Sequence, residues 1–190
     1  MKTKKITLIA LVSLIGLSFT VVELNEVKGW FLRGSEPSSY EIGIVEDSQR
    51  NGKVAYLKSI NPEIKNKFGT IMQSFSAEKY LDSKLKLTGY IKTKDVKGWV
   101  GMWMRVDGKK KHSLSFDNMG NRKIKGTTEW TKYEIILEVP KDSKSINYGV
   151  LLNETGMVWL DNLTFEIVLQ STATTGKKLS VAPENNNFEE

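Results

Sequence analysis

The hydrophobic pattern of this chain alternates with a period of two, in short segments between Trp30 and Val168. Alternating apolar and polar side chains are typical of a strand that buries one face. The segments cover residues 40–44, 54–60, 71–75, 85–91, 99–107, 114–118, 133–139, 146–152 and 157–168, the last with a break near Asn162. Turn-forming sequences separate them, among them RNGK at 50–53, VKG at 96–98 and NETG at 153–156, and residues 119–130 are predicted to be a loop. This number and spacing of strands predict an all-β protein, an antiparallel β-sandwich of the jelly-roll type.

Composition excludes several classes of site. A chain of 190 residues can close one sandwich core without disulfides, and it has no cysteine for thiol catalysis or cysteine-ligated zinc. The single histidine, His112, follows three lysines in a predicted loop, which does not suit a Ser-His-Asp triad. The net charge is +6, but the lysines are scattered, so nucleic-acid binding is not expected.

The two ends of the chain differ from its middle. Three lysines lie among residues 2–5, and the 17 residues from Ile6 to Val22 carry no charge. This pattern predicts a hydrophobic N-terminal helix, either a secretory signal or a short membrane anchor, with the rest of the chain outside the cytoplasm. Residues 170–190 are polar and aperiodic, which favours a disordered tail. The expected organisation is therefore 1–28 signal peptide or anchor, 29–169 β-sandwich, and 170–190 tail.

The stretch VKGWVGMWMRVDG, residues 96–108, separates into two rows of different character. Val100, Met102, Met104 and Val106 form an apolar row that predicts a core face, while Trp99, Trp103, Arg105 and Asp107 share the opposite row. Gly101 lies between the two indoles, where we expect a flat floor. Exposed indoles beside charged groups are typical of a contact site, and the C–H face of a sugar stacks well on indole. In the alternative, a loop or the N-terminal segment covers the indoles, and Arg105 and Asp107 simply pair.

Other carboxylates have less specific patterns. Asp117 and Asn118 lie at a predicted strand end, where they could contact a ligand, bind calcium or form Asx turns, of which turn formation is favoured. Asp161 shares a row with Trp159 and is expected to be hydrogen-bonded structurally rather than to ligate a metal. Glycoside hydrolysis needs two carboxylates facing one cleft, and no spacing here pairs two, so a non-catalytic role is favoured.

Three stretches carry a resemblance to a known family: VKGWVGMWMRVDG, LSFDNMG through YGVLL, and GMVWLDNLTFEIV. Together they resemble a bacterial β-sandwich domain found C-terminal to AraC-type helix-turn-helix regions in transcriptional regulators, over about residues 29–168. The order W-x-x-Y, V-P, I-x-x-G-V-L-L, G-x-V-W-L-D is similar, more distantly, to carbohydrate-binding modules with a galactose-binding-like fold. A hydrophobic segment stands here where those regulators carry the helix-turn-helix, so a DNA-binding role is not expected.

The sequence thus predicts a ligand-binding sandwich outside the cytoplasm, with carbohydrate or another cell-envelope ligand as its partner. No cofactor is expected, calcium being the one metal considered. A small glycan hydrolase or lyase and a protein-interaction module remain alternatives. The predicted ligand-binding residues are Trp99, Trp103, Arg105, Asp107, Asp117 and Asn118.

Overall fold

The computed structural model describes residues 27–176 and consists almost entirely of antiparallel strands. The predicted N-terminal helix, and with it the signal or anchor, lies outside the described residues. Within residues 27–176, no helix is long and apolar enough to span a membrane. The elements are β1 (Phe31–Gly34), η1 (Pro37–Ser39), β2 (Tyr40–Asp47), β3 (Gly52–Ser59), β4 (Phe68–Ser76), η2 (Glu78–Tyr80), β5 (Ser83–Asp107), η3 (Lys109–Lys111), β6 (Ser113–Asp117), β7 (Ile124–Val139), β8 (Ser145–Asn153) and β9 (Met157–Val168).

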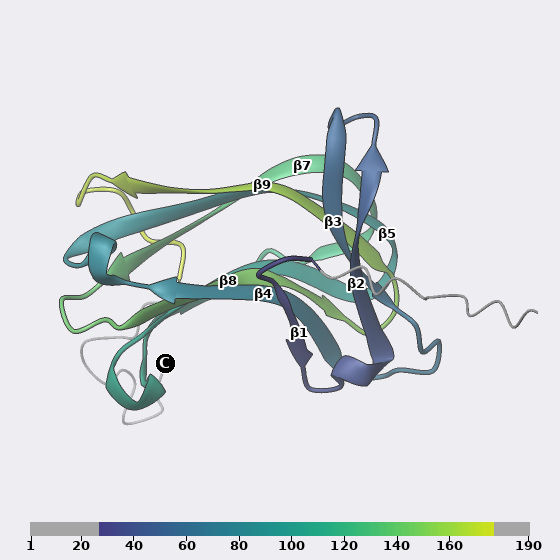
Figure 1. The fold of residues 1–190 in the computed structure, drawn as a ribbon, viewed down its shortest axis with the longest axis horizontal. Helices are drawn as coiled ribbons and strands as arrows, with labels where there is room; N and C mark the ends of the chain where they lie inside the picture. The colour runs from purple at the N-terminus through teal and green to yellow at the C-terminus, as the bar shows by residue number, and fades with distance from the viewer. Residues whose placement is uncertain (1–26, 177–190) are drawn as a thin grey trace, which may run out of the picture.

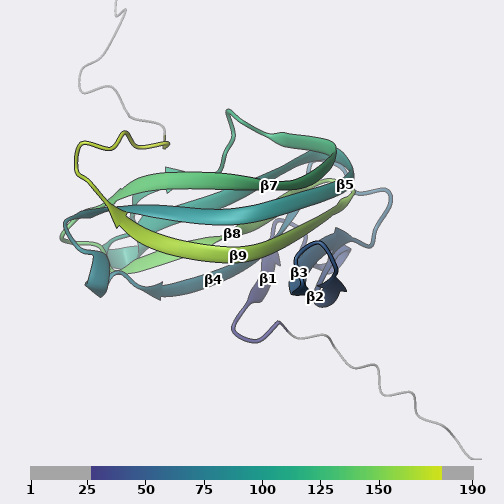
Figure 2. The ribbon, with the colours of Figure 1, turned by 90° about the horizontal axis from the view of Figure 1, so that it is seen from above.

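The strands form one hydrogen-bonded sheet that folds over on itself. Its order is β1-β4-β8-β5-β9-β3-β2, and β6 and β7 also pair with β5. Figure 1 shows β7 and β9 above β8 and β4, and in the view from above these two groups overlap (Figure 2). The all-β antiparallel prediction is confirmed, with the sheet curled into two facing layers.

Strand β5 belongs to both layers. Its residues 84–94 pair with β9, and β7 lies on the other side, whereas residues 99–107 pair with β8, with β6 beside them. The predicted turn at 96–98 is therefore wrong: the register of pairing with β7 shifts at Val96, and Asp95 has φ of +53°. A β-bulge bends a strand without ending it. Two predicted strands are thus one long strand that passes from one layer to the other.

Two further strand predictions need correction. Strand β1 was not predicted, because four residues are too few to show a period. Strand β7 begins at Ile124, inside the predicted loop, and its first residues pair irregularly with the bulged part of β5. The predicted break near Asn162 is a local irregularity and not an end of the strand: Asn162 has φ of +50° and the pairing with β5 shifts nearby, but β9 continues to Val168.

The core lies between the two layers and uses the row that the sequence predicts. Val100, Met102, Met104 and Val106 are completely buried. The core also includes Leu85, from the first half of β5, and inward side chains from β7 and β9. Each such side chain contributes about 1.5–3 kcal/mol when it is fully buried. Burial of this row fixes the direction of the other row of β5, which faces away from the core.

The first residues of the predicted tail contact the sandwich. Thr175 bonds with its backbone and its hydroxyl to the backbone of Ile136 on β7, and the Thr172 carbonyl accepts from Lys84. Residues 177–190 lie outside the described part.

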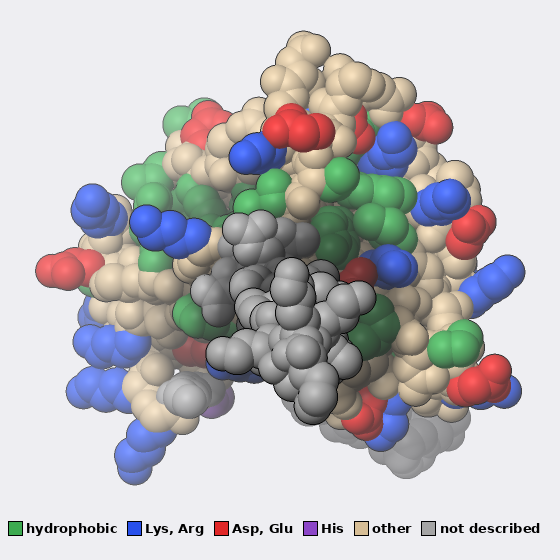
Figure 3. Space-filling model, turned by 45° about the vertical axis from the view of Figure 1, so that its right-hand side comes forward, with side chains coloured by type: hydrophobic (Ala, Val, Ile, Leu, Met, Phe, Trp, Pro, Cys, Tyr) green, Lys and Arg blue, Asp and Glu red, His purple; other side chains and the backbone are tan. Residues whose placement is uncertain are grey.

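Charged side chains are distributed, not gathered. Figure 3 shows Lys and Arg around the edge of one face, with Asp and Glu among them, while hydrophobic side chains lie nearer its centre. This face has no basic stripe of the kind that tracks a phosphate backbone.

Candidate functional site

The outward row of β5 lies on the outer face of the layer formed by β1, β4, β8, β5 and β6. Across β8, Trp99 is opposite Asn153, Trp103 is opposite Gly149 and Arg105 is opposite Asn147. The outward direction of this row is confirmed by the register and by the burial of the alternate row, but the expectation of two exposed indoles is wrong for Trp103, which is buried, while Trp99 is partly exposed.

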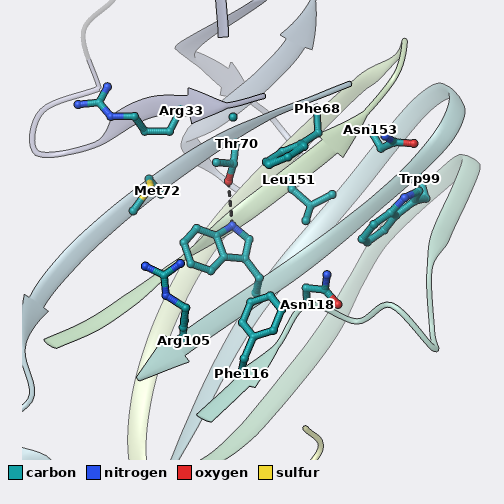
Figure 4. Close-up of a pocket in the computed structure, with 12 residues that line it drawn as sticks. Arg33, Phe68, Thr70, Met72, Trp99, Arg105, Phe116, Asn118, Leu151 and Asn153 are labelled. Atoms are coloured by element: carbon teal, nitrogen blue, oxygen red, sulfur yellow. Dashed lines mark hydrogen bonds between the residues drawn. The ribbon is translucent and has the colours of Figure 1, made fainter. Parts of the chain in front are cut away.

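A groove of about 370 Å³ crosses the strands of this layer. Figure 4 shows the side chains that line it, which come from five strands and from the loop after β6. The lining residues are Arg33 and Gly34 of β1, Phe68, Thr70 and Met72 of β4, Leu151 and Asn153 of β8, Trp99, Trp103 and Arg105 of β5, Phe116 of β6, and Asn118. A volume of this size is within the range of small-ligand sites.

Trp103 forms the floor of the groove and is only 8 % exposed. Its indole Nε1–H donates to Thr70 Oγ1 at 2.8 Å (Figure 4), and the Thr70 hydroxyl donates to the Val150 carbonyl at 2.9 Å. The indole reaches from β5 past Gly149 on β8 to β4. A Cβ on Gly149 would lie 2.1 Å from the Ile71 carbonyl oxygen, so β4 and β8 approach closely only because this residue is glycine. The ring is therefore held in one orientation before any ligand arrives.

Trp99 is half-buried and leans over Gly101. A Cβ on Gly101 would lie 2.8 Å from Trp99 Cζ3 and 2.4 Å from the backbone oxygen of Asn118. The expected flat floor at Gly101 is therefore wrong, because the indole and the Asn118 backbone already occupy that space. Lys123 Nζ lies 4.9 Å from the centre of the Trp99 ring.

Arg105 lines the groove, and Asp107 lies behind it. The carboxylate accepts from Arg105 Nε at 2.9 Å and from Nη2 at 2.9 Å, and also from Asn147 Nδ2 at 2.9 Å. Asp107 is 3 % exposed and does not line the groove. The structure thus places Asp107 as the group that holds the guanidinium in position, as in the alternative in which the two pair.

Asp117 is also directed away from the groove. Arg122 donates to both of its oxygens, at 3.2 and 2.7 Å, and the Met119 amide donates at 2.8 Å. Asn118 does line the groove, and its Oδ1 accepts from the Gly120 amide at 3.0 Å in a local turn. Of the six predicted residues, the groove brings together Trp99, Trp103, Arg105 and Asn118, and whether they bind a ligand stays a prediction.

The groove residues that sequence reasoning missed lie on neighbouring strands. Asn153 and Leu151 alternate with the core row of β8, so their face was visible in the pattern, but their position beside Trp99 depends on strand register. Phe68 and Phe116 are 37 % and 45 % exposed, and no pattern marks an exposed aromatic residue as part of a shared surface. Arg33 lies on β1, which was not predicted.

The opposite layer carries a second set of aromatic and charged side chains. Asp161 pairs with Arg50 at 2.7 Å, the structural role expected of it, and Arg50 lies over the Tyr90 ring at 4.1 Å. Lys92 lies 5.7 Å from the centre of the Trp159 ring.

The carboxylates nearest to the conspicuous aromatic side chains are engaged by arginines. None of the groove's lining residues is Asp or Glu, and Asp107, Asp117 and Asp161 are each paired with an arginine. Among residues 27–176, no three His, Asp or Glu side chains gather as a metal site would require.

Comparison with solved structures defines the class of fold. The enzymatically active domain of bacteriophage CBA120 tailspike protein 4 has a TM-score of 0.59 and 11 % identity, covering 76 % of this chain and 20 % of that one. The CBM22-1 xylan-binding domain of Paenibacillus barcinonensis Xyn10C has a TM-score of 0.51 and 14 % identity, covering 76 % and 90 %. The chain therefore has the fold of carbohydrate-binding-module β-sandwiches, and at these identities the likeness extends to the fold alone.

Comparison by sequence leads to a particular relative. The chain is 43 % identical over 171 residues to the uncharacterized HTH-type transcriptional regulator YbfP of Bacillus subtilis (strain 168). The match covers 87 % of this chain, and the chain spans 58 % of the length of that relative. This agrees with the resemblance to a regulator-associated domain, while no protein-family model matches the chain.

Proposed function

We propose that this chain is a non-catalytic module that binds an oligosaccharide in the groove across β1, β4, β8, β5 and β6. The observation that carries the proposal is the composition of the groove: an indole floor, further aromatic rings, and amide and guanidinium groups, with no carboxylate among the lining residues. Aromatic faces stack on sugar rings, and a few fixed polar groups orient the hydroxyls. The similarity of fold to a domain described as xylan-binding supports this assignment.

Two of the groove side chains are held in place by hydrogen bonds to neighbouring residues. The bond from Trp103 to Thr70 and the pair between Arg105 and Asp107 hold the floor and one polar group in place. A site whose side chains are already ordered loses less conformational entropy when the ligand binds. A glycan hydrolase is less well supported, because two carboxylates facing the groove are required and the lining provides neither.

A second candidate is a ligand-sensing role in a regulatory protein, favoured by the 43 % identity to an HTH-type regulator. Both candidates bind a ligand in the same groove. They differ in whether binding serves attachment to the ligand or changes the activity of a regulatory protein. A location outside the cytoplasm is also part of the proposal, and it is supported by the lysines and apolar run of residues 2–22.

The test is to titrate the full chain against immobilised xylo-, cello- and galacto-oligosaccharides, and to repeat it with Trp99→Ala. We expect binding, weakened about tenfold or more in the variant, because truncating a central aromatic contact costs about 2 kcal/mol and 1.4 kcal/mol is a factor of ten. Trp103 is a poorer choice, since removing a buried, hydrogen-bonded indole also destabilises the fold.

Trp159→Ala is the matched control, because Trp159 is also half-buried beneath a lysine but lies on the opposite layer. Thermal unfolding of both variants verifies that they remain folded. Binding to no oligosaccharide, or equal weakening by both substitutions, would contradict the proposal.

A further inference from the structure

The charged groups of the groove have one sign. Arg33 and Arg105 are the ionisable lining residues within the described part of the chain, and Lys123 places a third positive charge over the Trp99 ring. Among residues 27–176 the lining has no Asp or Glu, and the carboxylate of Asp107 lies behind Arg105. On the face that Figure 3 shows, by contrast, Asp and Glu lie among the Lys and Arg side chains.

Arg105 has one edge engaged and one edge free. Asp107 binds Nε and Nη2 from behind, whereas Nη1 makes no hydrogen bond to any residue within 27–176. The side chain of Arg105 is 41 % exposed and that of Asp107 is 4 % exposed, so a ligand in the groove meets the guanidinium and not the carboxylate. Asn147 binds the same carboxylate, which fixes its position further.

Arg33 lies on the same side of Trp103 as Arg105. In Figure 4 Met72 lies between the two arginines, while Asn118, Asn153 and Trp99 are on the other side of the indole. Arg33 is exposed, and its bond to a described residue is from Nη1 to the adjacent Leu32 carbonyl. The two ends of the groove therefore differ: Arg33 and Arg105 lie at one end, and at the other lie Asn118, Asn153 and Trp99, with the Lys123 ammonium over the Trp99 ring.

Taking the proposed function as its basis, we infer that the groove selects an acidic oligosaccharide, whose anionic group lies at the end marked by Arg33 and Arg105. A planar guanidinium donates two parallel hydrogen bonds to a carboxylate or a phosphate, which a neutral hydroxyl cannot match. The sugar rings on either side of this group would contact Trp103 and the aromatic side chains beside it. Uronic acids and sugar phosphates supply the same chemistry and are separated by experiment.

The test is to measure binding of the full chain to a panel with three arms: neutral, uronic-acid-containing and phosphate-bearing oligosaccharides. We expect the tightest binding in one acidic arm, and a several-fold loss between 50 and 300 mM salt, because exposed charges are screened. Arg33→Gln should weaken acidic binding about fivefold and leave any neutral binding unchanged. Arg105→Lys keeps the positive charge but loses the paired N–H donors of the guanidinium. It should lower the ratio of acidic to neutral oligosaccharide affinity.

Lys53→Gln is the control for net charge, because it removes one exposed positive charge from β3 in the other layer. Binding to neutral oligosaccharides only would overturn this inference and leave the proposed function standing. Binding in no arm would overturn both. Acidic binding that Arg33→Gln and Lys53→Gln weaken equally would contradict the assigned position of the anionic group.

Discussion

At the scale of single residues, Gly101 shows how closely the groove is built. If Gly101 carried a Cβ, that atom would lie 2.4 Å from the backbone oxygen of Asn118 and 2.8 Å from the Trp99 ring. A flexible side chain can move aside, but a backbone carbonyl cannot without displacing the loop. Gly101 thus permits both the position of Asn118 and the tilt of Trp99.

Gly101→Ala should therefore lower the free energy of unfolding by about 1–3 kcal/mol, the usual cost of overpacking. Trp99 should also change environment, which its fluorescence would report. The control is Gly52→Ala, where a Cβ meets nothing within 4 Å. Its free energy of unfolding should be unchanged or slightly higher. Equal effects of the two substitutions would show that the contact at Gly101 is unimportant.

The sequence predicts the direction of residues better than their exposure. Alternation along β5 correctly assigns Trp99, Trp103 and Arg105 to the outer face, because a strand's period requires it. Exposure depends on distant partners: Trp103 is covered because Thr70, 33 residues away, accepts its bond. The pair between Arg105 and Asp107 is one of the alternatives that the row of β5 offered, whereas Arg122, which binds Asp117, lies in a predicted loop where no pattern marks it as a partner.

At the scale of secondary structure, the bulge in β5 determines how the two layers are joined. Asp95 has a left-handed backbone, with φ of +53°, and its amide donates to the hydroxyl of Thr127 on β7 at 3.0 Å. Asp tolerates this conformation better than most residues. The glycine and lysines around it resemble a turn, which is why sequence analysis ended a strand there.

Asp95→Val should lower the free energy of unfolding by about 1–2 kcal/mol, because a β-branched side chain is strained at positive φ. Asp95→Gly should be neutral or stabilising by a few tenths of a kcal/mol. Lys94→Val, at the exposed and extended neighbouring position, serves as the control and should change little. Chemical denaturation measures all three, and an Asp95→Val variant as stable as Lys94→Val would contradict the argument.

At the scale of the whole molecule, Tyr40 connects the two layers. It begins β2 in one layer, and its hydroxyl lies 3.1 Å from the carbonyl oxygens of both Lys67 and Glu154, which flank strands of the other. Burial disfavours the phenolate and raises the pKa of Tyr40 to about 12. The folded state therefore retains this proton at a pH where the unfolded chain, with its pKa near 10, loses it.

The free energy of unfolding should consequently fall as pH rises from about 10 to 12, by up to about 2–3 kcal/mol from Tyr40 alone. Burial raises the pKa of Tyr133 and Tyr148 as well, so they add to the same trend. Tyr40→Phe should be less stable at neutral pH and show a smaller alkaline loss. Parallel pH profiles for the two chains, measured by urea denaturation, would contradict this assignment.

The all-β class and the position of most strands follow from alternation alone, but the short strand β1, the continuity of β5 and the pairing of strands do not. Nothing local indicates that β8 lies between β4 and β5, or that β6 and β8 are both neighbours of β5. The groove exists only through these pairings, so its aromatic centre could be predicted and its outline could not.

Because one strand serves both layers, neither layer can shift without the other. A displacement along β5 would move the groove floor at Trp103 together with the inward side chains of its first half, such as Leu85, which belong to the other layer and contribute to the shared core. The groove thus has no hinge of its own, and its rigidity is a property of the entire sandwich.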